Sequence, residues 1–167
     1  MPDYPKDVAR LLAEPHSVSL GPGTPNEALR AKLKATSAAI LPPCAAGLWL
    51  RFDFLDESHS ICQTAEGVPD YDFWHAIMHR REPDAFNSKY WWRRVGAHPV
   101  LEQLRERAPE VGYAYTTPEE FVDFCEKVRD TGSTDEELAN RVQQLEWQLL
   151  FDHCLRSDLR CTLRGQE

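Results

Sequence analysis

A chain of 167 residues has room for one compact domain, which buries about two-thirds of the surface that its unfolded form exposes. Its 42% hydrophobic and 28% charged residues are ordinary for a globular protein and exclude an intrinsically disordered chain. The net charge of −8 argues against a general binder of nucleic acid or of anionic membranes, because such proteins present a basic face.

The cysteines and the amino terminus indicate where the protein works. The five cysteines are odd in number and widely spaced, without a C-x-x-C pair, so neither a disulfide framework nor a thiolate zinc site is expected. The first residues lack the pattern of a signal peptide, and no apolar run reaches the roughly eighteen residues that a membrane span requires. We therefore expect a cytoplasmic protein with no membrane partner.

The amino-terminal part is predicted to form two helices. Residues 5–14 carry apolar side chains at helical spacing, and this helix is expected to end near Pro15. After a loop rich in glycine and proline, Thr24 is a favourable N-cap and Pro25 a favourable first residue. The second helix is predicted to run to about residue 39.

Residues 44–64 are predicted to form one long, buried central helix, because apolar residues cover nearly its whole circumference. His59 lies on its most apolar stripe, and Asp56 lies one turn before it on the same side. Another helix is expected over residues 71–81, and Pro83 stops it.

The remaining chain is predicted to form four more helices. Asn87 or Ser88 is expected to cap the first, and Pro99 begins the second. Residues 117–120, Thr-Pro-Glu-Glu, have the form of a capping box and open the third. The last helix is the longest, over about residues 135–155, with leucine and valine in a regular seam.

These elements predict the fold class. Only residues 111–115 resemble a strand, and one strand of that length cannot build a sheet. The sequence therefore predicts a single all-α domain, a bundle of about seven or eight helices in which residues 1–43 pack on a core formed by residues 44–156.

A pair of histidines predicts a metal site. His75 and His79 are four residues apart, which places both imidazoles on one helix face within reach of one ion. Zn²⁺ is the preferred ion, ahead of Fe²⁺. His59 is the best third ligand, because an unpaired imidazole on an apolar stripe is costly. The alternative is an ordinary core histidine that a carboxylate or a backbone carbonyl satisfies.

Further polar residues are assigned to the surroundings of this site. Glu82 follows His79 by three residues and is the candidate general base, or it holds the second nitrogen of a ligand histidine; its alternative is a salt bridge to an arginine. Glu146 lies beside the apolar seam of the last helix and is expected to pair with an arginine. Asp56 and His98 are also assigned to the surroundings of the metal site. The alternative for His98, which precedes a predicted helix, is to cap that helix.

A group of arginine and aromatic residues predicts an anion site. Guanidinium groups bind phosphates and carboxylates, and aromatic rings supply a stacking wall for a small anionic molecule. The residues assigned to this pocket are Arg80, Arg81, Tyr90, Trp91, Arg93 and Arg94. One alternative is a single-stranded nucleic-acid platform, which the acidic composition disfavours. Others are arginines that neutralise buried acids, and a tryptophan-rich face that forms a homodimer.

About half of the chain resembles a family of small bacterial proteins. The segments that carry the resemblance are W-H-A-I-M-H-R-R-E-P-D, N-S-K-Y-W-W-R-R-V-G-A-H-P-V and L-E-W-Q-L-L-F-D-H-C. No activity is established for that family, so the resemblance implies a site in these segments and leaves its chemistry open.

Together these patterns predict a metal-binding helical protein. If it is an enzyme, we expect a metal-dependent hydrolase or lyase, in which the ion activates water or a substrate oxygen and Glu82 moves the proton. The alternative is a non-catalytic module that binds an anionic ligand or partner through the arginine and tryptophan residues, with metal-free histidines. A third hypothesis is a purely structural helical protein with buried ion pairs.

Overall fold

A computed structural model of the chain describes the backbone of residues 4–164 and the side chains of residues 4–156. Within these residues the fold is all-α, without a strand, as the sequence predicted. The helices number nine in the described chain, because the predicted central helix is divided in two. None of the described helices combines the length and the apolar character needed to cross a bilayer.

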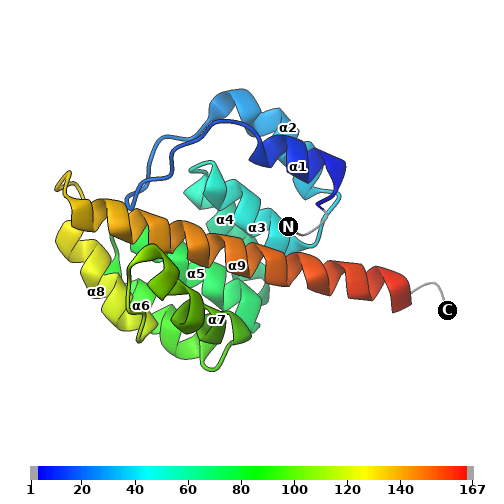
Figure 1. Cartoon of the computed structure of the whole chain (residues 1–167). Coiled ribbons are helices and arrows are strands. Elements are labelled where there is room, and N and C mark those ends of the chain that lie inside the picture. The colour runs from blue at the N-terminus through cyan, green and yellow to red at the C-terminus, as the bar shows by residue number, and fades with distance from the viewer. Residues whose placement is uncertain (1–3, 165–167) are drawn as a thin grey trace.

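The helices follow one another with short connections. They are α1 (Lys6–Leu12), α2 (Arg30–Ser37), α3 (Pro42–Arg51), α4 (Leu55–Cys62), α5 (Pro69–Arg81), α6 (Ala85–Val95), α7 (Pro99–Arg107), α8 (Pro118–Val128) and α9 (Thr134–Arg164). Three short 3₁₀ segments accompany them, at Glu27–Leu29, Gln63–Ala65 and Ala108–Val111. The long helix α9 crosses the molecule, with α1 and α2 on one side and α6 to α8 on the other (Figure 1).

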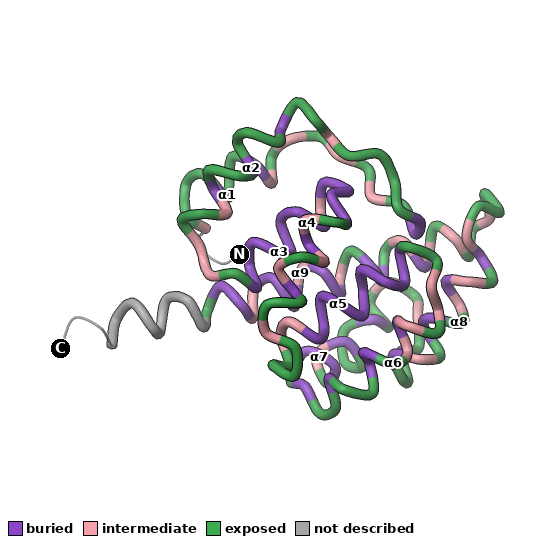
Figure 2. The backbone as a smooth tube through the Cα atoms, turned by 180° about the vertical axis from the view of Figure 1, so that it is seen from behind, coloured by how far each residue is buried: buried purple, intermediate pink, exposed green. Residues whose placement is uncertain are grey.

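Helix α5 is the buried centre of the bundle, and residues 72–81 are all buried (Figure 2). It packs against α3, α4 and α6. Gly47 lets α3 pass close to α5, because a Cβ atom there would lie 2.7 Å from Cζ2 of Trp74. Trp147 of α9 donates from Nε1 to the carbonyl of Gly47 at 2.8 Å. When a helix is buried on all sides, neighbouring elements must supply the hydrogen-bond partners of its polar side chains.

The prediction of one helix over residues 44–64 is wrong. Asp53 takes a positive φ of 67° between α3 and α4. Arg81 of α5 donates to its carboxylate, and His16 Nε2 lies 2.8 Å from Asp53 Oδ2. This buried ion pair fixes a left-handed residue that the apolar periodicity did not indicate. The break ends α3 at Arg51 and begins α4 at Leu55, and His59 of α4 lies against His75 and His79 of α5.

Two predicted caps are also wrong. The second helix begins later than expected: Glu27–Leu29 forms a 3₁₀ turn and α2 starts at Arg30, while the amide of Thr24 donates to Asp53 Oδ2 at 3.2 Å. Helix α6 is capped by Asp84, which accepts from the amide of Asn87 at 3.0 Å. The starts of α7 at Pro99 and of α8 at a Thr117 cap are confirmed, and α9 extends beyond the predicted end at residue 155.

Candidate metal centre

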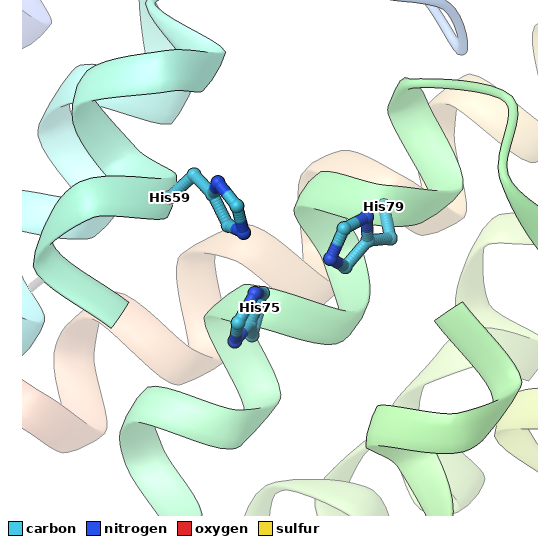
Figure 3. A group of neighbouring side chains, drawn as sticks. All are labelled: His59, His75 and His79. Atoms are coloured by element: carbon cyan, nitrogen blue, oxygen red, sulfur yellow. The ribbon is translucent and has the colours of Figure 1, made fainter. Parts of the chain in front are cut away.

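Three histidines converge between α4 and α5 (Figure 3). His75 and His79 project from one face of α5 with their rings nearly parallel, at 18° and with centroids 4.9 Å apart. His59 reaches across from α4, with its ring centroid 4.7 Å from that of His75 and 5.2 Å from that of His79. One ligand atom from each histidine lies within 4.8 Å of the other two. The structure thus brings together the three residues that the sequence assigned as ligands, hereafter the histidine triad.

His75 is the most buried member of the triad, with 1% of its surface exposed. Neither Nδ1 nor Nε2 has a hydrogen-bond partner among the described residues. Trp91 stacks on the ring at a centroid distance of 3.8 Å and an angle of 20°. Burial, helped by the positive charges of His79, His59 and Arg94, lowers the pKa of His75 to about 3. His75 is therefore neutral at pH 7, which is the form that ligates a metal.

His79 is held by a carboxylate. Its Nδ1 lies 3.0 Å from Glu82 Oε2, and the ionised carboxylate can only accept, so Nδ1 carries the proton. Nε2 is then the nitrogen with a free lone pair. Burial lowers the pKa of His79, against the opposing charge of Glu82. A carboxylate that holds the second nitrogen of a histidine is the usual support of a metal ligand, so Glu82 fits one of its expected roles.

His59 is half-buried and forms the side of the triad nearest to solvent. Asp56, which the sequence placed beside it, is exposed. The residue that encloses the triad instead is Trp91, which the sequence assigned to a wall for an anionic ligand. Helical spacing within α4 gave no information about which side chain of α6 covers His75.

His98 does not join the triad but belongs to a second cluster with Asp70 and His153. Asp70 Oδ1 lies 2.9 Å from His98 Nε2 and 3.3 Å from His153 Nε2. Burial raises the pKa of Asp70, but hydrogen bonds from His153 and His98 outweigh that effect and hold this pKa below its usual range. Sequence reasoning missed the cluster, since its members lie on α5, α9 and the residue before α7.

The tautomer of His98 argues against a second metal site in this cluster. His98 Nδ1 accepts from the amide of Val100 at 3.2 Å and so caps α7, which was its alternative role. An accepting Nδ1 leaves the proton on Nε2, which then donates to Asp70. His98 consequently has no lone pair available for an ion, and the cluster ties three helices together.

Arg80 and Arg81 lie in the core and do not form the predicted anion pocket. Arg80 pairs with Glu146, with Nη2 2.5 Å from Oε2, and both side chains have no exposed surface. Glu146 therefore pairs with an arginine, as expected. Arg81 donates to the carbonyl of Leu50 at 2.6 Å and to the carboxylate of Asp53. Both guanidinium groups are committed to the fold because α5 is buried all round.

The other members of that predicted pocket lie on α6. Arg93 is exposed, and Tyr90 has 42% of its surface exposed. The guanidinium of Arg94 lies over the ring of Trp91 at 5.1 Å, and its Nε is 3.6 Å from Asp72 Oδ2. Of the arginines assigned to the predicted anion pocket, Arg94 is therefore the one linked to the triad, because it stacks on Trp91, which stacks on His75.

No family model, curated protein or solved structure matches this chain. The resemblance to a bacterial family therefore stays a prediction. What the chain does must be inferred from the geometry of its own residues.

Proposed function

We propose that the protein binds one transition-metal ion, Zn²⁺ before Fe²⁺, through His59, His75 and His79. The observation that carries the proposal is the side chain of His75, which is buried with both ring nitrogens unsatisfied. Such a group costs free energy unless something supplies its missing partner. Two further imidazoles that face it and a carboxylate behind one of them point to a cation as that partner.

The donor set favours zinc. Three neutral imidazoles are a usual ligand set for catalytic Zn²⁺, which keeps its fourth position for water or substrate. We expect access from the side of His59, because it is the half-buried member of the triad. A bound ion of this kind lowers the pKa of a water molecule or polarises a substrate oxygen.

We extend the proposal to a hydrolase or lyase that acts on a small anionic substrate. Arg94 is the cation that would attract the substrate, because it stacks on the tryptophan that covers His75. Glu82 holds Nδ1 of His79, behind the ligand, so a role in proton transfer would require its other oxygen to turn toward the ion. One of its oxygens accepts from His79, and the other has no hydrogen bond among the described residues.

Metal content tests the proposal. Tag-free protein should hold about one zinc or iron ion per chain by elemental mass spectrometry, and His75→Ala should lose it while keeping its helical circular dichroism. His153→Gln is the matched control, because it removes a histidine of the second cluster and leaves the triad intact. Equal loss of metal in both variants, or no metal after supplementation of the growth medium, would refute the proposal.

A further inference from the structure

A separate pocket of about 320 Å³ lies on the opposite face of α5 from the histidine triad. His75 and His79 share one face of the helix, whereas Ile77 and Arg81 are rotated by about 200° from them. These last two residues line the pocket, together with residues from α1, the loop after it, the end of α3, and α9. Its volume is at the lower end of the range for small-molecule sites.

The charges of this pocket are unbalanced. Its lining contains two arginines, Arg51 and Arg81, and no carboxylate. Arg81 is compensated by its ion pair with Asp53. Arg51 is half-buried, and its Nη1 donates to the backbone carbonyl of His16 at 3.2 Å. The carboxylate of Asp53 attracts Arg51 as well as Arg81, so one negative charge faces two guanidinium groups and the pocket retains a net positive charge.

The rest of the lining mixes apolar side chains with four polar ones, His16, Gln143, Gln144 and Gln148. Leu12, Val18 and Ile77 contribute aliphatic surface, and Trp147 contributes its indole. The indole N–H of Trp147 is already bonded to the carbonyl of Gly47, so the ring offers the pocket apolar surface only. A half-buried guanidinium beside such walls is suited to a ligand with one anionic group and an apolar body.

We propose that this pocket binds a small amphipathic monoanion, with a carboxylate on Arg51 and an aliphatic or aromatic body against Leu12, Val18 and Trp147. A single net positive charge favours a carboxylate over a dianionic phosphate, which would leave one negative charge unpaired. The site is distinct from the metal centre and does not depend on it. One helix therefore presents a cation site on one face and an organic-acid site on the other.

Titration calorimetry with matched acids and amides tests this site. The probes are octanoate and indole-3-acetate, each compared with its neutral amide, and the difference between the two acids shows whether the body is aliphatic or aromatic. At least one acid should bind saturably, and its amide should bind about tenfold more weakly or worse, since a hydrogen-bonded charge contributes that much.

Variants then locate the site. Arg51→Gln should weaken binding of the acid by about ten- to hundredfold, and Arg51→Lys should weaken it less because the charge remains. Arg107→Gln is the matched control, since it removes an exposed arginine on α7, and it should leave the affinity unchanged. Val18→Phe narrows the pocket without changing its charge and should also abolish binding.

Three results would overturn the inference: equal affinity for acid and amide, equal affinity in Arg51→Gln and Arg107→Gln, or no saturable binding of either acid up to about 10 mM. If Arg51→Gln does not fold, the acid and amide comparison in the unmodified protein and the Val18→Phe variant still decide the matter.

Discussion

Acidification of the metal-free protein should destabilise it through His75. The pKa of this imidazole is lowered to about 3 in the folded protein, chiefly by burial, from an ordinary value of 6.5. Between these two values the unfolded chain binds a proton that the folded chain does not. The free energy of unfolding must therefore fall as the pH decreases through this window, and stability is regained above pH 6.5.

The size of the effect follows from the two pKa values. Between pH 7 and pH 5 the imidazole of the unfolded chain becomes almost fully protonated, whereas that of the folded chain stays neutral. This difference lowers the free energy of unfolding by about 2 kcal/mol. Only 1% of His75 is exposed, so solvent screening does not reduce this figure much. A loss of this size is a large part of the total stability of an ordinary domain.

Urea unfolding at pH 7 and pH 5 measures the effect, with tryptophan fluorescence as the signal and a chelator present throughout. His75→Leu removes the imidazole while keeping a side chain of similar volume, so it should lose about 2 kcal/mol less than the unmodified protein between the two pH values. The lowered pKa of His79 acts in the same direction and remains in both proteins. An equal loss of stability in both would refute the assignment of His75 as a buried, neutral imidazole.

Three further experiments test other contacts. Glu82→Gln should keep the fold but weaken zinc binding by about ten- to hundredfold in competition with a coloured chelator, and unchanged affinity would show that Glu82 does not support His79. Glu146→Leu should destabilise by about 3–5 kcal/mol in urea because Arg80 is left buried and unpaired, whereas the double variant with Arg80→Met should recover most of that loss; no recovery would contradict the ion pair. Gly47→Ala should cost about 1–3 kcal/mol, since its Cβ meets Trp74, and a neutral result would contradict the close approach of α3 to α5.

The sequence predicted those features that depend on local spacing. Helical periodicity and capping residues were sufficient for the all-α class and for the start of α8 at Thr117. The pairing of His75 with His79 on one face followed from their separation alone. The proximity of His59 was inferred from the cost of an unpaired imidazole on an apolar stripe, and the structure agrees.

Features that depend on contacts between distant segments could not be predicted in the same way. The break between α3 and α4 is set by Asp53 and Arg81, which are 28 residues apart, while the flanking phenylalanines keep the apolar pattern of a continuous helix. Arg80 pairs with Glu146, which lies 66 residues further along the chain. Because α5 is buried all round, its sequence has no polar face to show which arginines reach solvent.

The central claim is that one ion joins α4 to α5 through three imidazoles. X-ray absorption at the zinc edge of the loaded protein tests it most directly, in the unmodified chain and in His59→Ala. We expect three imidazole nitrogens at about 2.0 Å in the unmodified chain and a shell that has lost one of them in His59→Ala. A shell of oxygen ligands alone, or identical spectra for the two proteins, would contradict it.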